Sequence, residues 1–423
     1  MNNPDFENEV NIINNLKFKH FEDIKCGELL ATKLFYEKKS ISYISALRYL
    51  ISIFLNSHIY KKNKSDSETA FFFTPSYAGR MDHYNDFIAV ASCVNEPLIF
   101  NGNKQKKAFS INRIIAIFYW FLWLVEMKKT GFQLNYCMQL CNLMLQTYYV
   151  LEEVKTNKFN KDKIKLVVTF CDVHPCDYLI TQYFNRLGIK TATLQHAVFY
   201  HGTQWYCYRF SHSNYFFANS EYCKNEALKS DYKGEVKIVG SMKSIYLTNS
   251  DDNRGSENGL KKTFGLALCG LTFAEQNRSL LDYASYLQKK WGYSVLVRFH
   301  PALKKEEYMA AINKLEKYEF SNEPVNEFAS KCDFVILGAS NMFAELIGFD
   351  TPTFRVISDG VADIYEGIDE FKFENREELD KLVELIDDKK ELVPILRKVK
   401  RYLCPEGDIK ELYRRTIQEI ILN

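Results

Sequence analysis

Two motifs in the C-terminal half of the sequence combine side chains that bind anions. Arg298, His300 and Pro301 close an apolar run, SVLVRFHP (294–301), which is typical of a buried strand. Arg298 and His300 are two positions apart and so share one face of a strand. A guanidinium beside an imidazole suits a phosphate group, and Pro301 fixes the turn that follows. We therefore expect this motif to hold phosphate; the alternative is a hydrogen-bonded structural histidine.

The second motif is GASN (338–341), which follows the apolar run CDFVIL (332–337). Small residues at a strand–helix turn let backbone N–H groups approach a ligand, and the start of a helix favours an anion. Ser340 and Asn341 add side-chain donors. Glu345 lies about one helical turn further on, where its carboxylate can accept hydrogen bonds from ribose hydroxyls. The spacing is not G-x-G-x-x-G, which disfavours a dinucleotide-binding site of that type.

A third turn, GLT (270–272), ends the apolar run FGLALCG (264–270). Gly270 and Thr272 form either another phosphate site or a helix cap. The cap is favoured as strongly as the site, because Thr272 and Glu275 have the spacing of a capping box.

Polar side chains in the N-terminal half are candidates for a general base and for acceptor contacts. A histidine with a pKa near neutrality, or an aspartate, is the usual base for an acceptor hydroxyl. Surface or structural hydrogen bonding is the alternative role for each of them. The candidate bases are His174 and Asp172 first and His196 second, and the acceptor-side candidates are Gln195, His201, Arg80, Asp82 and His83.

These residues follow apolar runs that alternate with helical patterns, which predicts an α/β protein with parallel sheets. IKLVVTF (164–170) is the clearest buried strand, and Pro175 is placed to begin the helix after it. The polar stretch 246–262 has two glycines and no apolar period, which indicates a linker. We predict an N-terminal domain over 1–245 with extra helices, this linker, a C-terminal donor-binding domain over 263–400 and a C-terminal helix over 401–423.

Composition excludes several classes of protein. Hydrophobic residues make up 47% of the 423 residues and charged residues 26%, as in folded globular proteins. With 55 basic and 53 acidic residues the chain has no global field for binding nucleic acid. The 11 cysteines include no C-x-x-C pair, so we expect reduced thiols and no metal site. P-loop and G-x-S-x-G motifs are absent.

One apolar segment raises the question of membrane contact. Ile114–Val125 (IIAIFYWFLWLV) is about 12 residues long, whereas a bilayer span needs about 20. It is either a buried core helix or an interfacial helix with Trp120 and Trp123 at the level of the lipid headgroups. Lysines flank it within 104–129. The start of the chain lacks the pattern of a signal peptide. We expect a cytoplasmic protein, with peripheral contact to the inner face of the plasma membrane if the helix is interfacial.

Several stretches together resemble the GT-B glycosyltransferases of bacterial surface polysaccharide synthesis. They are LQHAVFYHG (194–202), ANSEYCKNEALKS (218–230), IVGSMKS (238–244), VLVRFHP (295–301) and DFVILGASNMFAELIGFDTPTF (333–354). The likeness is strongest to the HP-motif group, which contains bacterial sialyl- and polysialyltransferases, capsule Kdo transferases and teichoic-acid glycerophosphotransferases. It covers roughly 165–355, and its most specific part is the ordered pair R-x-H-P and S-x-x-x-x-E.

The resemblance implies two facing Rossmann-like domains and a metal-independent transfer from a nucleotide-activated sugar without another cofactor. A CMP- or CDP-linked donor is implied ahead of a UDP-linked one, and a growing cell-surface glycan or a lipid-linked glycan is the acceptor. His300, Ser340 and Asn341 would contact donor phosphate and Glu345 the ribose. Transfer of a polyol phosphate from CDP-glycerol or CDP-ribitol is the second hypothesis. A catalytically inactive assembly scaffold is the third, because Asn341 departs from the motif and no acidic D/E-D/E-G motif is visible.

Overall fold

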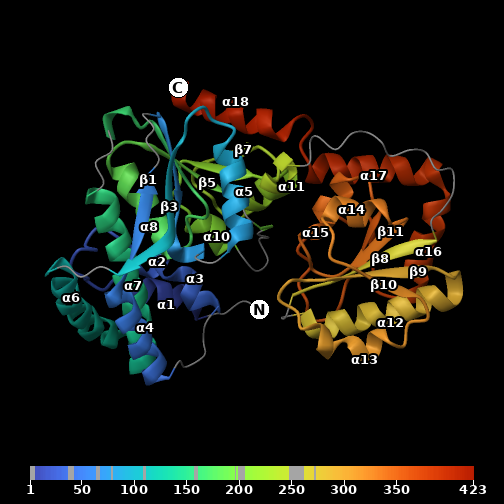
Figure 1. Cartoon of the computed structure of the whole chain (residues 1–423), viewed down its shortest axis with the longest axis horizontal. Helices are drawn as coiled ribbons and strands as arrows, with labels where there is room; N and C mark the ends of the chain where they lie inside the picture. Colours follow the sequence, from blue (N-terminus) through green and yellow to red (C-terminus); the bar gives the residue numbers. More distant parts are fainter. Residues whose placement is uncertain are drawn as a thin grey trace.

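The computed structural model describes residues 5–36, 42–62, 67–77, 80–107, 111–156, 161–195, 197–198, 205–246, 262–270 and 273–423. These residues form two α/β domains, each built around one mainly parallel sheet (Figure 1). Most of the predicted linker, residues 247–261, lies outside the described residues.

The N-terminal sheet has the strand order β1-β3-β2-β4-β5-β6-β7. Its strands pair in parallel except β1 with β3, which is an antiparallel edge pair. β2 and β4 are buried along their whole length, which explains their continuous apolar sequences. The bounds are β1 Asn56–Lys62, β2 Thr69–Phe73, β3 Leu98–Lys107, β4 Leu166–Thr169, β5 Lys190–Leu194, β6 Tyr215–Ala218 and β7 Glu235–Ile238.

Helices cover this sheet and extend it at the N-terminus. Pro175 occupies the first turn of α8, and Gly188 follows the helix with φ of 71°. The placement of Pro175 confirms the sequence prediction, and Gly188 has the left-handed backbone that commonly ends a helix. The helices are α1 Phe6–Asn14, α2 Cys26–Leu29, α3 Ala31–Tyr36, α4 Tyr43–Leu55, α5 Met81–Ala91, α6 Ile111–Met127, α7 Leu134–Thr156, α8 Pro175–Arg186, α10 Tyr206–Arg209, α11 Glu221–Lys229 and the 3-10 helix η4 Met242–Tyr246.

The C-terminal sheet has the order β10-β9-β8-β11-β12-β13, with every pair parallel. β8 therefore lies between β9 and β11, and their carboxyl ends share one edge. The bounds are β8 Thr263–Leu268, β9 Ser294–Phe299, β10 Tyr318–Ser321, β11 Phe334–Leu337, β12 Thr353–Val356, β13 Lys372–Phe373, α12 Ala274–Trp291, α13 Met309–Ile312, α14 Val325–Ser330, α15 Met342–Gly348, α16 Arg376–Asp387, α17 Lys389–Leu403 and α18 Ile409–Leu422.

Helix α12 begins at Ala274, and Phe273, its N-cap residue, makes no capping hydrogen bond through its side chain. Glu275 lies in the first turn, where an acidic residue favours the helix start. Thr272, the other half of the expected capping box, lies outside the described residues.

The last helix, α18, returns to the N-terminal domain. The Tyr413 hydroxyl donates to the Gly240 carbonyl oxygen over 3.1 Å, and its ring lies 6.0 Å from that of Phe217. Lys190 Nζ donates to the Ile420 carbonyl oxygen over 2.9 Å. The chain therefore crosses between the domains a second time, after α17.

The apolar segment 114–125 lies in α6, and its tryptophans are in the core. Trp120 and Trp123 are buried, and their indole N–H groups donate to Asn142 Oδ1 and the Lys19 carbonyl oxygen. Of the two predictions for this segment, the core helix is confirmed for the side that carries the tryptophans, and their placement at headgroup level was wrong, because α7 packs on that side. Among the described residues no helix has both the length and the hydropathy needed to cross a bilayer.

Candidate functional site

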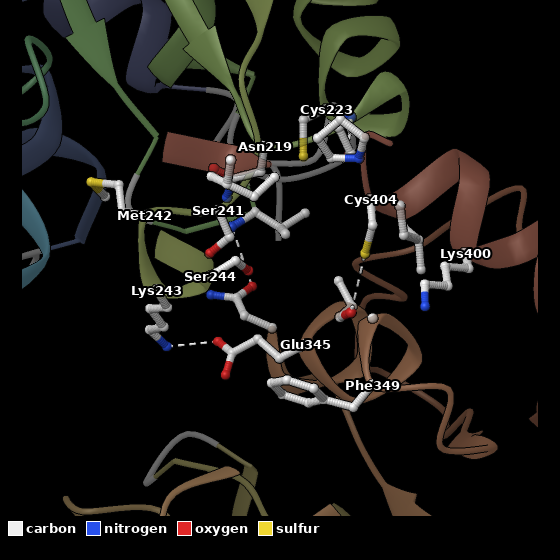
Figure 2. A pocket seen from close by; sticks show the side chains of 18 of the residues that line it. Asn219, Cys223, Ser241, Met242, Lys243, Ser244, Glu345, Phe349, Lys400 and Cys404 are labelled. Atoms are coloured by element: carbon white, nitrogen blue, oxygen red, sulfur yellow. Dashed lines mark hydrogen bonds and ion pairs between the residues drawn. The ribbon is translucent and has the colours of Figure 1, made fainter. Parts of the chain in front are cut away.

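A cavity of about 930 Å³ lies between the two domains (Figure 2). Residues that follow β5, β6 and β7 line it on the N-terminal side, and α15 and the end of α17 line it on the other side. Among its lining residues are Asp86, Gln195, Lys243, Asn341, Glu345 and Lys400. Ligands of open parallel sheets bind outside the carboxyl ends of the strands, where this cavity lies.

An ion pair spans the cavity from one domain to the other. Lys243 Nζ of η4 lies 2.7 Å from Glu345 Oε1 of α15. Burial alone would lower the pKa of the Lys243 ammonium, but the carboxylates of Glu345, Asp86 and Asp82 raise it. Lys243 therefore carries a firmly held positive charge. The structure places Glu345, the expected ribose ligand, directly at the cavity wall.

The start of α5 adds a charged cluster next to this pair. Arg80 Nη2 lies 2.6 Å from Asp82 Oδ2, and His83 Nδ1 lies 3.8 Å from the same atom. The hydrogen bond from Arg80 holds the pKa of Asp82 well below its usual range. Burial lowers the pKa of His83, and the charges of Arg80 and Lys243 act in the same direction. The structure thus brings three of the five predicted acceptor-side residues, Arg80, Asp82 and His83, near Lys243.

Asp86, on the same helix, was missed by the sequence analysis. Its carboxyl has a pKa raised to about 6: burial is the main cause, the carboxylates of Glu345 and Asp82 add to the rise, and Lys243 opposes it. Asp86 lines the cavity. One sequence signal pointed to it, since it is four residues after Asp82 and therefore on the same helix face.

The turn after β9 lies at the same sheet edge. His300 Nδ1 accepts a hydrogen bond from the Ala302 N–H over 3.1 Å, and Pro301 follows in the exposed turn. The ring lies against Gly270, since a Cβ added at Gly270 would be 3.7 Å from His300 Cε1. Burial lowers the pKa of His300, and the charges of Arg80 and Lys243 lower it further. His300 and Gly270 are thus neighbours. Arg80 and Lys243 of the N-terminal domain are close enough for their charges to lower the pKa of His300.

Arg298 has partners within its own domain. Its Nη1 donates to the Glu323 carbonyl oxygen, and the guanidinium lies 5.7 Å from the centre of the Phe328 ring. Burial lowers its pKa, although the Glu345 carboxylate opposes this. Asn341 and Glu345 line the interdomain cavity, whereas Arg298 and His300 do not.

The GASN turn already has protein partners. Gln276 is buried, and its Oε1 accepts a hydrogen bond from the Ala339 N–H over 2.9 Å. A Cβ at Gly338 would come within 2.0 Å of the same oxygen. Ser340 Oγ accepts from the Met342 N–H over 3.3 Å. The turn after β11 is therefore held by Gln276 as well as by its own helix.

Asn341 and Gln195 connect the turn to the N-terminal domain. Asn341 Oδ1 accepts from the Val198 N–H over 3.2 Å. Gln195 is buried at the end of β5, lines the cavity and accepts from the Asn219 N–H through Oε1 over 2.9 Å. His196, His201 and Thr272 lie outside the described residues.

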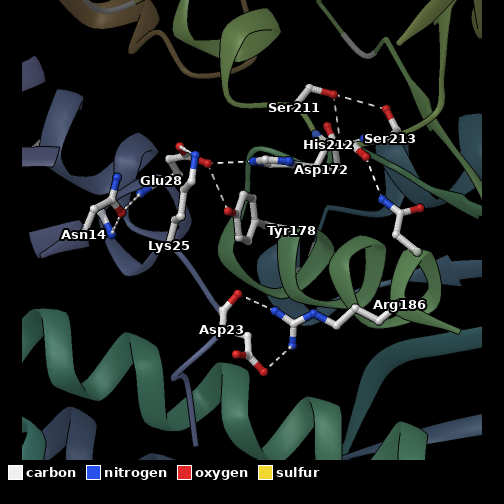
Figure 3. A network of polar contacts seen from close by, with 12 residues as sticks. Asn14, Asp23, Lys25, Glu28, Asp172, Tyr178, Arg186, Ser211, His212 and Ser213 are labelled. Atoms are coloured by element: carbon white, nitrogen blue, oxygen red, sulfur yellow. Dashed lines mark hydrogen bonds and ion pairs between the residues drawn. The ribbon is translucent and has the colours of Figure 1, made fainter. Parts of the chain in front are cut away.

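The structure does not bring Asp172 to the cavity. Its buried Oδ2 accepts hydrogen bonds from Ser211 Oγ and from the backbone N–H groups of His212 and Ser213, at 2.9, 3.0 and 2.9 Å (Figure 3). Burial raises the pKa of the Asp172 carboxyl, and these donors oppose the rise. Asp172 thus holds the loop between α10 and β6.

His174 lies at the start of α8 and has a different environment. Burial lowers the pKa of its imidazole to about 4, and the charge of His83 acts in the same direction. The ring is therefore neutral at pH 7. His174 lies close enough to His83 to be affected by its charge, whereas Asp172 is held by the loop before β6.

Comparison with solved structures identifies the arrangement of the domains. The co-structure of S. aureus MnaA with UDP superposes with a TM-score of 0.51 at 12% identity, covering 83% of this chain and 95% of that one. The chain has a GT-B-like fold. Two Rossmann-like domains facing a cleft, as expected from the sequence, are thereby confirmed.

Other structures with similarity to this GT-B-like fold score lower. A UDP-N-acetylglucosamine 2-epimerase from Listeria monocytogenes has a TM-score of 0.48 at 13% identity and covers 84% of this chain and 95% of that one. Phytolacca americana UGT2, complexed with UDP-2-fluoro-glucose and pterostilbene, has a TM-score of 0.47 at 10% identity, covering 84% and 100%. The sequence matches no protein-family model and no curated protein.

Proposed function

We propose that this protein is a glycosyltransferase that moves a sugar from a nucleotide-activated donor to an acceptor hydroxyl in the cleft between its domains. One observation carries the proposal. Lys243 and Asp86 of one domain meet Glu345 of the other in a cavity at the carboxyl ends of both sheets. A GT-B-like fold agrees with this placement, and MnaA, which has a similar fold, was solved in a co-structure with a nucleotide, UDP.

The donor nucleotide is assigned to the C-terminal domain. Glu345 accepts hydrogen bonds from the ribose hydroxyls, and positive charges near it neutralise the phosphate. His300 Nδ1 accepts the Ala302 N–H, so the neutral ring carries its proton on Nε2 and donates from there to a phosphate oxygen. Lys243 and Arg80 approach from the other domain. Donors placed in advance where negative charge develops commonly supply the largest catalytic contribution.

Asp86 is the general base in this proposal. Its pKa of about 6 leaves the carboxylate ionised at pH 7 and still basic enough to take a proton. The acceptor hydroxyl gives its proton to Asp86 as its oxygen bonds to the anomeric carbon. The bond from that carbon to the phosphate oxygen breaks, and the nucleotide leaves with the electron pair. His174, neutral and near His83, is the second candidate.

We take the proposed donor nucleotide and acceptor from the family that the sequence resembles. A cytidine donor is proposed ahead of a uridine donor, and the acceptor is a growing cell-surface glycan or a lipid-linked glycan. The cavity contains both a carboxylate for ribose and cations for phosphate, a combination that suits any nucleoside phosphate.

A nucleotide-binding screen tests the proposal first. Thermal unfolding with CMP, CDP, UDP and GDP should show stabilisation by about 2.7 kcal/mol when a nucleotide is present at 100 times its Kd. Absence of a shift with every nucleotide would refute the proposal and favour the inactive scaffold.

A donor panel with mass spectrometry of the product tests the reaction. Transfer of a sugar supports the proposal, whereas a product with phosphorus in its backbone assigns polyol-phosphate transfer instead. His300→Ala should abolish turnover without changing the thermal midpoint of the free protein. Wild-type turnover in that variant would exclude the phosphate role of His300.

A further inference from the structure

The outer face of α6 is apolar and uncovered among the described residues. Ile114, Phe118, Phe121 and Val125 are 50%, 61%, 55% and 68% exposed. Their spacing of four, three and four residues aligns them on one side of the helix. The opposite side, with Trp120 among others, is buried. α6 therefore has two apolar faces, of which packing on α7 uses one.

α4 repeats this arrangement. Ile44, Leu47, Ile51 and Leu55 are between 49% and 64% exposed, while Leu50 on the other side is buried. An ordinary surface helix presents polar residues outward. α4 departs from this rule in the same way as α6.

The two helices both pack on α7, and the start of α6 contacts the end of α4. Asn142 of α7 donates through Nδ2 to the Ala46 carbonyl oxygen of α4 over 2.8 Å. Its Oδ1 accepts the indole N–H of Trp120 from α6 over 2.9 Å. Arg113, at the start of α6, donates to the Phe54 carbonyl oxygen of α4 over 2.8 Å. We call the eight exposed side chains named in the two paragraphs above the α4–α6 face.

The charge of the surrounding chain is one-sided. Residues 42–64 and 98–125 contain no aspartate or glutamate, but they contain Arg48, Lys61, Lys62, Lys64, Lys104, Lys106, Lys107 and Arg113. The rest of the chain carries a net charge of −6, since these segments hold eight basic residues and the whole chain carries +2. Lys104 on β3 pairs with Ile59 on β1, and Lys107 pairs with Asn56, the residue directly after α4. The lysine-rich strand pair thus continues directly from α4.

We infer that the α4–α6 face docks on an anionic membrane surface. Exposed apolar side chains on two helices, followed in the chain by a lysine-rich strand pair, match the two layers of such a surface, acyl chains beneath negatively charged headgroups. A second copy of the chain fits less well, because both copies carry the same excess of basic residues in these segments. The helices lie in the interface plane and do not cross the bilayer, which agrees with the absence of a spanning helix among the described residues.

The position of the face leaves the cleft accessible. Figure 1 shows α4 and α6 at the lower left of the N-terminal domain, whereas the C-terminal domain lies to the right. Docking through α4 and α6 therefore leaves the interdomain cavity uncovered. This inference does not depend on the proposed transferase activity.

Vesicle co-sedimentation with the full chain tests it. Wild-type protein should pellet with vesicles of phosphatidylglycerol and phosphatidylcholine, and binding should weaken as salt is raised. The double variant Phe118→Glu/Val125→Glu should lower the partition coefficient at least about tenfold. Lys104→Gln/Lys106→Gln should lower it about fivefold per lysine, and only with the anionic vesicles.

Leu422→Glu is the matched control, because Leu422 is 83% exposed but lies at the end of α18. Equal loss of binding in this control, or failure of the wild type to pellet with anionic vesicles, overturns the inference. Sedimentation velocity tests whether a second copy of the chain covers the face instead. If the wild type is a dimer, and Phe118→Glu/Val125→Glu is monomeric with unchanged vesicle binding, the face belongs to a dimer interface and the inference is overturned. If the double variant does not unfold cooperatively, Phe118→Gln replaces it.

Discussion

Lys243 and Glu345 form an ion pair that joins the two domains, with 2.7 Å between Nζ and Oε1. Lys243 belongs to the turn after the last strand of the N-terminal sheet, and Glu345 to the helix after β11. When a nucleotide binds, we expect Lys243 to exchange this carboxylate for phosphate and Glu345 to turn to the ribose. The pair thus links donor binding to the relative position of the domains.

Glu345→Gln should weaken nucleotide binding by about tenfold to a hundredfold. A hydrogen bond to a charged group contributes about 1.5–3 kcal/mol, and the amide loses that charge. Titration calorimetry with the nucleotide that gives the largest thermal shift measures the effect. Glu384→Gln, an exposed position on α16, is the control and should bind as the wild type does. Unchanged affinity in Glu345→Gln would exclude the ribose role.

Asp86 should give the pH profile of kcat/KM an acidic limb near pH 6. Its pKa is raised to about 6, so the carboxyl is protonated below that pH and cannot accept a proton. Activity should fall about tenfold per pH unit below the limb and reach a plateau above it. Asp86→Asn should remove the limb and lower kcat at pH 7 by about 10²–10⁴.

Lys243→Gln provides an independent check of the same assignment. The Lys243 ammonium lowers the pKa of Asp86, so its removal should move the limb to higher pH. A limb that persists in Asp86→Asn would show that another group is the base.

Gly338→Ala should destabilise the protein by about 2 kcal/mol, because a Cβ at this position would lie 2.0 Å from the buried Gln276 Oε1. Gly270→Ala is the matched control, since its Cβ would meet the His300 ring only at 3.7 Å. Urea unfolding of both variants measures the difference. Equal stability of the two would mean that Gln276 can move away without cost.

Glu28→Ala should cost about 3 kcal/mol, because it removes the partner of a partly buried pair. Glu28 Oε2 lies 2.6 Å from His212 Nε2 and accepts from the Tyr178 hydroxyl over 3.1 Å (Figure 3). Glu7→Ala, whose exposed carboxylate pairs with Arg209 over 3.1 Å, is the control and should cost at most about 1 kcal/mol. Urea unfolding at pH 7 measures both.

The same pair predicts a pH dependence of stability. Burial alone would raise the pKa of Glu28, but His212 and Lys25 lower it below the ordinary value of 4.5. The native state therefore binds this proton less readily than the unfolded chain does. The stabilisation is present above the unfolded pKa and is lost as the pH falls through the folded pKa. The acid loss of stability should be smaller in Glu28→Ala than in the wild type.

Local sequence was sufficient for the strands that are buried on both faces. β4, β8, β9 and β11 are continuous apolar runs, a pattern that requires no knowledge of neighbouring elements. Local sequence was insufficient for β1 and β3. Their polar, lysine-rich sequence resembles a loop, and only pairing at the sheet edge makes them strands.

The candidate site divides in the same way. His300 directly follows β9 and Glu345 lies in the helix after β11, so their placement at a sheet edge could be predicted. The meeting of Lys243 and Asp86 with Glu345 could not be predicted, because only the packing of α5 against η4 brings them together. The buried carboxylate of Asp172 also carried no sequence signal for the loop that it holds.

The sequence by itself determined two parallel sheets and the residues at their strand ends, because burial on both faces and strand–helix alternation leave a local pattern. Tertiary structure decided which charged side chains meet across the cleft and which side of α6 faces outward. Both outcomes depend on contacts between segments far apart in the chain. The Trp120 side of α6 is buried because α7 lies there, and no pattern within a uniformly apolar helix records where its neighbour will pack.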